Sequence, residues 1–330
     1  MKNRFLILLS FVLIVGRDVV CANTSMVRER ININRDWRYQ IDDPDGVGAA
    51  LHYSRLKPYL LPCANDFIIF GKRYQRPEGN PGENIAYVKS DFDDSEWRHL
   101  NLPHDWAIEG PFNIDYNGST GKLPYWGIRW YRKTLELSQD DAGKQIYLDI
   151  DGAMSYVSVW CNGQYVGGWP YGYASFRLDL TPYIKAGQKN VLAIRLDNPD
   201  DTSRWYPGSG IYRNVWLVKT SPVHVEQWGT FVRNQQVDSE IAVMEMGVNI
   251  ENHAGKDVQV KLQTSVYLQG KDGRPVGEEV TQSMTKDIAI KKDSWSSARF
   301  QFKVDKPKLW DIDTPNCYVA VSRVFLDGKA

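Results

Sequence analysis

The stretch "SYVSVWCNGQYVGGW" at residues 155–169 decides the fold of this chain. It contains two strand-like runs, which flank the pair Asn162-Gly163. Asparagine and glycine accept the positive φ angles that a two-residue hairpin loop requires at both central positions. The stretch therefore predicts two antiparallel strands joined by a tight turn.

Strand patterns continue on both sides of this hairpin. The run "QIYLDIDG" at 145–152 alternates aliphatic residues with tyrosine and aspartate, the period of two expected from a sheet with one face in water. No segment keeps helical spacing of apolar residues over three turns. Together these patterns predict an all-β protein, with further strands at 175–180, 190–196 and 214–219.

The character of the sequence changes after Pro222, where tryptophan and glycine become less frequent. The run "DVQVKLQTSVYL" at 257–268 alternates strictly, and similar runs recur at the spacing of a small β-sandwich. We predict a jelly-roll sandwich over residues 23–220 and an immunoglobulin-like sandwich over 221–330. The segment 45–85, rich in proline, glycine and tyrosine, is predicted to be an insertion, and its role cannot be read from the sequence.

Residues 1–22 have the composition of a secretory signal peptide. Basic residues precede an apolar run, and small residues near Ala22 predict cleavage there. Acylation of Cys21, which would make the protein a lipoprotein, is the alternative. Either process predicts export to the periplasm or the cell surface. No later apolar run reaches the roughly 20 residues that span a bilayer.

The overall composition excludes several classes of partner. The chain has 330 residues and a formal net charge of +0, so it shows no basic surface for nucleic acid or anionic lipid. The cysteines lie far apart, the five histidines do not cluster, and no glycine-rich nucleotide motif is present, so we predict no metal and no cofactor. The 12 tryptophans, 18 tyrosines and 11 phenylalanines favour a sugar or apolar ligand.

Three pairs of adjacent aspartates could suggest acid–base chemistry. Side chains of adjacent residues in extended chain point to opposite faces, and each pair lies in a turn-like context. We therefore predict that Asp93-Asp94, Asp140-Asp141 and Asp200-Asp201 are solvated turn residues. The cluster "DNPDD" at 197–201 lacks the spacing of an EF-hand loop, and a bound calcium ion stays an open alternative there.

The stretch "SRWYPGSGIYRN" at 203–214 is predicted to be a loop of defined conformation, because its glycines and proline are unsuited to a core strand. Together with the stretches at 92–112, 127–137 and 151–184, it resembles the N-terminal sugar-binding domain of glycoside hydrolase family 2. The part after residue 221 resembles the immunoglobulin-like second domain of that family. Within the family, "LPHDW" and "RWYPGSGIYRNV" are most similar to bacterial β-galactosidases.

The resemblance implies that loops of this domain contact a sugar at the mouth of a catalytic (β/α)₈ barrel. It assigns Asp105 to bind sugar hydroxyls, with an Asx turn before Trp106 as the alternative. Trp205 would stack on a sugar face and Arg204 would donate to hydroxyls or a carboxylate, although packing between domains is the alternative for the rings. Ser203 and Arg204 stand where related enzymes have an aspartate, and His104 is predicted to be a structural loop residue.

The catalytic chemistry is predicted to lie outside this sequence. The family's acid glutamate follows an asparagine, and the chain contains no Asn-Glu dipeptide. Asp327-Gly328 predicts a hairpin whose second strand is absent, as expected of the front of a longer polypeptide. We therefore predict no catalytic residues here, and a partner barrel in the same polypeptide acting on a β-galactoside.

Two other functions stay open at this stage. Rings in "GGWPYGYASF" (167–176) would suit a stand-alone carbohydrate-binding module, and a two-sandwich surface scaffold without hydrolysis is the third alternative. The sequence gives neither the exact sugar and its linkage nor whether the protein forms a homo-oligomer.

Overall fold

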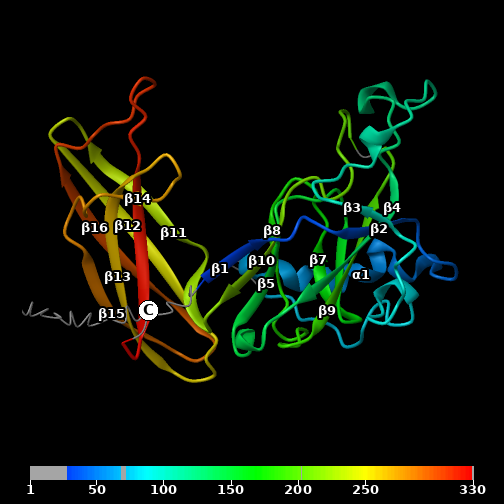
Figure 1. Cartoon of the computed structure of the whole chain (residues 1–330), viewed down its shortest axis with the longest axis horizontal. Helices are drawn as coiled ribbons and strands as arrows, with labels where there is room; N and C mark the ends of the chain where they lie inside the picture. Colours follow the sequence, from blue (N-terminus) through cyan, green and yellow to red (C-terminus); the bar gives the residue numbers. More distant parts are fainter. Residues whose placement is uncertain (1–27, 68–71, 202, 329–330) are drawn as a thin grey trace, which may run out of the picture.

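The computed structural model describes residues 28–67, 72–201 and 203–328, so the predicted signal peptide and Cys21 lie outside the described residues. Figure 1 shows two β-rich bodies side by side along the long axis of the molecule. The strands confirm the all-β prediction. In the first body they are β1 (Arg28–Asn32), β2 (Trp37–Ile41), β3 (Arg98–Leu100), β4 (Gly127–Glu136), β5 (Gln145–Ile150), β6 (Val157–Cys161), β7 (Gln164–Trp169), β8 (Phe176–Asp179), β9 (Lys189–Asn198) and β10 (Val215–Thr220).

The first body is a sandwich of two sheets. One sheet has the order β1-β10-β5-β8, and the other has the order β3-β2-β4-β9-β6-β7. Inward-facing residues of both sheets form one apolar core, which includes Trp37, Leu148, Val159, Leu178 and Ile194. Successive side chains of a strand point to opposite faces, so alternate residues of each strand enter this common layer.

The predicted hairpin is confirmed. Strands β6 and β7 pair antiparallel around Asn162 and Gly163, whose φ angles are 52° and 80°. The Asn162 side chain adds hydrogen bonds to the carbonyl oxygen of Tyr183 at 2.8 Å and to Oδ1 of Asn190 at 2.7 Å. The turn is therefore held by its backbone conformation and by side-chain contacts to the neighbouring loop.

The segment predicted as an insertion covers the outer face of the six-stranded sheet. Its helices are α1 (Tyr53–Leu60) and the 3₁₀ turns Gly48–Leu51 and Leu61–Phe67; other 3₁₀ turns are Ala86–Val88, Ala107–Glu109, Gly118–Thr120 and Gln139–Asp141. Leu56 and Leu60 of α1 belong to a second apolar core with Trp130 and Trp160 of the sheet. The indole of Trp160 donates to the carbonyl oxygen of Pro81 at 2.7 Å. This second core accounts for part of the high aromatic content, which composition alone had suggested was for a ligand.

The second body is also a sandwich. Its strands are β11 (Val223–Val237), β12 (Ile241–Asn252), β13 (Val258–Gln269), β14 (Pro275–Val276), β15 (Met284–Ile290), β16 (Ser294–Asp305) and β17 (Tyr318–Leu326). One sheet has the order β11-β12-β16, and in the other β13 pairs with β14, β15 and β17. A separate apolar core, with Val248, Leu262 and Phe300 among its members, lies between them. The predicted boundary near Ser221 falls between β10 and β11.

Two predictions about aspartates are wrong. The outer face of β5 is not open to water, because Asp149 is buried and accepts two hydrogen bonds from Arg177 at 2.6 and 2.8 Å. Asp141 is likewise buried, with Lys219 Nζ at 2.6 Å and Lys144 Nζ at 3.0 Å. Ion pairing satisfies these carboxylates inside the protein, which a period-two pattern cannot show.

Among the described residues, no helix is long and apolar enough to cross a bilayer. The thiol of Cys161 is buried, and burial raises its pKa to about 12, whereas Cys317 is exposed. Neither of these two cysteines forms a disulfide within the described part of the chain.

Candidate functional site

Two loops of the first sandwich meet at the site that the sequence predicts. The first follows β3 and contains "LPHDW"; the second connects β9 to β10 and contains Trp205. The backbone N–H of His104 donates to the carbonyl oxygen of Ile211 at 2.9 Å, which joins the loops directly. Gly210 has a φ of +85°, and a Cβ there would lie 2.4 Å from the carbonyl oxygen of His104. The loops can approach this closely only because residue 210 is glycine.

The sequence left two alternative roles for Asp105, an Asx turn and the binding of sugar hydroxyls. Its carboxylate has oxygens for both. Its Oδ1 accepts from the backbone N–H of Ala107 at 3.0 Å, which is the predicted Asx turn. Its Oδ2 accepts from the hydroxyl of Tyr206 at 2.6 Å. An ionised carboxylate has about four acceptor positions, so about two are left for ligand hydroxyls. Burial, followed by the hydrogen bond to Asp105, raises the pKa of Tyr206 and keeps the phenol protonated as a donor.

Trp205 lies on the surface beside two tyrosines. Its side chain is 58% exposed, and its indole N–H donates to the hydroxyl of Tyr173 at 2.9 Å. That hydroxyl in turn donates to the carbonyl oxygen of Pro207 at 3.2 Å. Tyr171 meets Tyr173 edge to face, with ring centroids 5.6 Å apart. We call Tyr171, Tyr173 and Trp205 the exposed ring cluster; it offers apolar faces to a ligand.

Ser203 and Arg204 take different places in the loop. The Ser203 hydroxyl donates to the carbonyl oxygen of Trp205 at 2.6 Å, so it shapes the turn that presents the indole. Arg204 is exposed and has no hydrogen-bond or ion-pair partner within the described part of the chain. Its guanidinium is therefore available to a ligand or to another protein surface.

His104 has the structural role that was predicted for it. The buried imidazole contacts the hydroxyl of Tyr131 at 2.8 Å and Oε1 of Glu109 at 3.2 Å. Glu109 is itself held by two hydrogen bonds from Arg98, both 2.7 Å long. Burial lowers the pKa of His104, and no serine or cysteine nucleophile contacts its ring in the described residues.

Two of the three aspartates at 197–201 have carboxylates that contact other side chains. Oδ1 of Asp200 accepts from the hydroxyl of Tyr125 at 3.0 Å, and Asp197 pairs with Arg195 at 3.3 Å. Within the described ranges, no three or more of histidine, cysteine, aspartate and glutamate are grouped so that they could hold a metal ion.

Sequence reasoning did not find two partners in this site. Packing between domains was one of two interpretations of the ring of Tyr206, and Tyr173 was considered as one of the rings at 167–176 that would suit a carbohydrate-binding module. Their hydroxyls contact Asp105 and Trp205, which lie 101 and 32 positions away along the chain. Trp169, predicted to belong with Tyr171 and Tyr173, stacks instead on Phe176 with centroids 6.2 Å apart.

The same residues can be compared with known families. Residues 86–221 match the description "Glycosyl hydrolases family 2, sugar binding domain", and residues 223–330 match "Glycosyl hydrolases family 2". The chain belongs to glycoside hydrolase family 2. The matched residues include the second sandwich and the part of the first that follows residue 85, and Asp105 and Trp205 lie in the part matched by the sugar-binding domain.

Similar proteins are much longer than this chain. The β-galactosidase BoGH2A of Bacteroides ovatus is 40% identical over 309 residues, which are 92% of this chain and 31% of that protein. A putative β-glucuronidase of Formosa agariphila is 34% identical over 79% of this chain and 25% of its own length. The chain therefore spans about a quarter to a third of these relatives.

Solved structures show the same arrangement of strands. A glycosyl hydrolase family 2 member from Bacteroides cellulosilyticus has a TM-score of 0.72 at 27% identity, over 91% of this chain and 34% of that one. A β-glycosidase from Bacteroides vulgatus has a TM-score of 0.66 at 30% identity, over 91% of this chain and 32% of that one. Both comparisons extend across the two sandwiches.

Proposed function

We propose that this chain is the non-catalytic, sugar-holding part of an exported glycoside hydrolase that removes terminal β-galactosides from oligo- or polysaccharides. The proposal rests on the surroundings of Asp105. Its carboxylate is fixed by hydrogen bonds from Ala107 and Tyr206 and has acceptor positions left open. It lies next to the exposed ring cluster. A hexose can bind through its hydroxyl groups, which donate to carboxylate oxygens, and through its apolar C–H face, which stacks on an aromatic ring.

We propose that another domain of the same polypeptide cleaves the glycosidic bond. In a retaining glycosidase, two carboxyl groups about 5 Å apart flank the glycosidic bond, one as acid and the other as nucleophile. We assign both to a (β/α)₈ barrel that follows the second sandwich. Asp105 would orient the sugar ring at the non-reducing end, because it binds hydroxyls rather than the anomeric carbon.

A galactoside is proposed over a glucuronide for two reasons. A β-galactosidase is 40% identical over nearly the whole of this chain. In addition, the carboxylate of Asp105 would repel the carboxylate of a uronic acid. Glucuronide is the second candidate, because several relatives are β-glucuronidases and the guanidinium of Arg204 is available to pair with a uronate.

Hydrolysis of p-nitrophenyl β-galactoside and p-nitrophenyl β-glucuronide separates these possibilities. We expect the polypeptide encoded by the complete reading frame to prefer the galactoside, and the 330-residue chain to hydrolyse neither. Preference for the glucuronide would support the second candidate. A reading frame that stops at Ala330 would contradict the proposal, and calorimetry with galactosides would then distinguish a stand-alone sugar-binding module from a scaffold that binds none.

A further inference from the structure

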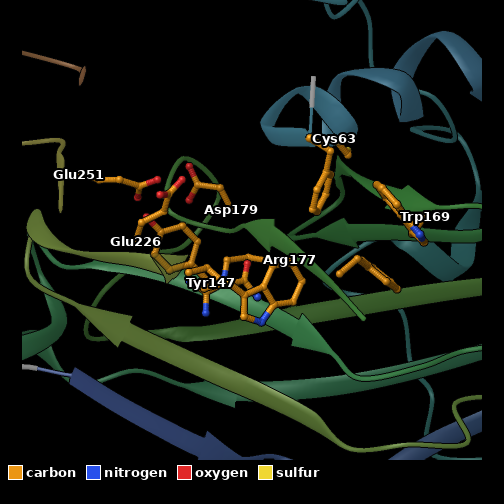
Figure 2. A pocket seen from close by; sticks show the side chains of 11 residues that line it. Cys63, Tyr147, Trp169, Arg177, Asp179, Glu226 and Glu251 are labelled. Atoms are coloured by element: carbon orange, nitrogen blue, oxygen red, sulfur yellow. The ribbon is translucent and has the colours of Figure 1, made fainter. Parts of the chain in front are cut away.

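A second concave site lies between the two sandwiches. It is a pocket of about 270 Å³ lined by residues of both bodies and of the insertion. Figure 2 shows carboxylate side chains gathered on one side, and Trp169 with the segment that carries Cys63 on the other. None of its lining residues belongs to the site around Asp105. The lining residues are Cys63, Phe67, Tyr147, Trp169, Phe176, Arg177, Asp179, Glu226, Gln227, Trp228 and Glu251.

Aromatic rings form one wall of this pocket. Trp169 stacks on Phe176 with an angle of 14° between the rings. Phe67 contacts Trp169 at a centroid distance of 5.7 Å and Trp228 at 6.2 Å. Phe67 and Trp228 are 54% and 63% exposed, so the wall is open to a ligand. Stacking on the apolar face of a sugar is a common use of such rings.

The backbone around Trp228 is arranged to present its ring. The pairing of β11 with β12 shifts register between Val225 and Thr230, which marks a β-bulge. Trp228 lies within this bulge and has a φ of +54°, a conformation that bulky residues rarely adopt. Bulges re-aim side chains at functional sites, and a strained backbone there points to a role beyond packing.

Three carboxylates on the opposite wall each use only one oxygen in the hydrogen bonds and ion pairs of the described residues. Oδ1 of Asp179 accepts from the N–H of Thr181 at 2.8 Å, and Oε2 of Glu226 accepts from Asn249 at 2.9 Å. Oε2 of Glu251 is 3.3 Å from both His224 and His253. The second oxygen of each carboxylate has no hydrogen-bond partner in the described part of the chain. These oxygens are acceptors for ligand hydroxyls.

The charge of the lining selects against an anionic ligand. The one arginine, Arg177, is neutralised by its two hydrogen bonds to Asp149 and lies over the ring of Tyr147 at 4.7 Å. Among the described residues, no lysine lines the pocket. We propose that this pocket is a second carbohydrate site, which binds an uncharged hexose unit between the aromatic wall and the carboxylates. An attached uronic acid would place like charges together.

Fluorine NMR of the 330-residue chain labelled with fluorotryptophan tests the proposal residue by residue. Methyl β-galactoside and methyl β-galacturonoside, which differ only in oxidation at carbon 6, serve as matched probes. We expect the galactoside to shift the signals of Trp228 and Trp169, and the galacturonoside to bind about tenfold more weakly or not at all. Equal binding of both probes, or no shift at Trp228 and Trp169, would overturn the proposal.

Substitutions separate this site from the one proposed around Asp105. Trp228→Ala is expected to weaken galactoside binding in the pocket about tenfold or more, and Trp228→Phe to restore most of it. Trp295→Ala, which removes another ring of the second sandwich that is 60% exposed, is the control and should have no effect. If the galactoside shifts only the signal of Trp205, the site around Asp105 stands and the pocket fails. If it shifts only the signals of Trp228 and Trp169, the pocket stands, and the site around Asp105 is decided separately by the kinetics of Asp105 variants of the complete polypeptide.

Discussion

The hydroxyl of Tyr206 donates to Oδ2 of Asp105 over 2.6 Å, although 101 residues separate the two along the chain. This bond joins the loop after β3 to the loop before β10 and fixes the carboxylate relative to the exposed ring cluster. Tyr206 is partly buried, so the bond is shielded from competing water.

Tyr206→Phe removes this bond and leaves the ring in place. We expect unfolding to require about 1 kcal/mol less free energy, because a partly buried hydrogen bond to a charged acceptor is lost. Urea denaturation measures the change. Tyr171→Phe is the matched control, since its hydroxyl is exposed and has no hydrogen bond within the described residues. Equal stability of the two variants would show that the Asp105 contact does not hold the loops.

Gly210→Ala tests the close approach of the same loops. The added Cβ would lie 2.4 Å from the carbonyl oxygen of His104 and 2.7 Å from the hydroxyl of Tyr131, at a φ of +85°. We expect a loss of stability of about 3 kcal/mol or more. Gly143→Ala has a similar φ of +79° and open space around it, so it should cost only about 1 kcal/mol. Similar losses from both would rule out the steric explanation.

Leu56→Ala tests whether the insertion stabilises the sheet that it covers. Leu56 is 2% exposed in the second core with Trp130 and Trp160. Removal of its side chain should lower the free energy of unfolding by about 2–5 kcal/mol. The control is Leu309→Ala, at a site that is 41% exposed, with an expected change below about 0.5 kcal/mol. A small effect at Leu56 would mean that the insertion is only a surface appendage.

The histidine contacts of Glu251 predict how stability depends on pH. Burial opposes ionisation of Glu251, but hydrogen bonds from His224 and His253 prevail and lower its pKa from 4.5 to about 2. Its stabilising effect is therefore present above pH 4.5 and lost as the pH falls toward 2. The hydrogen bond to Glu251 raises the pKa of His253 above 6.5, so that contribution is complete below pH 6.5 and lost as the pH rises through the raised value.

Together these shifts place the largest contribution of the pair between pH 4.5 and 6.5. The difference in melting temperature between the native chain and Glu251→Gln should be greatest in this window and smaller on either side. A difference that does not change with pH would show that the His253–Glu251 contact contributes no charge interaction.

Local features of the fold were predictable from the sequence, and long-range ones were not. The hairpin at Asn162-Gly163 follows from backbone preferences of two adjacent residues, so its turn could be placed before the structure was known. The role of the insertion could not, because nothing local shows that Trp130 and Trp160 face outward and need a cover. Asp149 was misjudged for the same reason, since Arg177 lies on another strand, and so was Asp141, since Lys219 lies 78 positions away along the chain.

The same distinction between local and long-range features applies to the candidate site. The resemblance of "LPHDW" to family 2 enzymes selected Asp105, and the Asx turn follows from its local sequence. The hydrogen bonds from Tyr206 to Asp105 and from Trp205 to Tyr173 depend on how three loops meet in space. No pattern along the chain encodes those distances.

Hydrolysis of p-nitrophenyl β-galactoside by the complete polypeptide, compared between Asp105→Asn and Asp93→Asn, tests most directly whether this domain holds the sugar. Asp93 is the matched control, because its carboxylate also accepts from a backbone N–H two residues ahead, that of Ser95 at 3.0 Å, and is exposed. We predict that kcat/KM falls about tenfold or more for Asp105→Asn and is unchanged for Asp93→Asn, with both variants folded. Equal kcat/KM values for the two variants would contradict a sugar-binding role for Asp105.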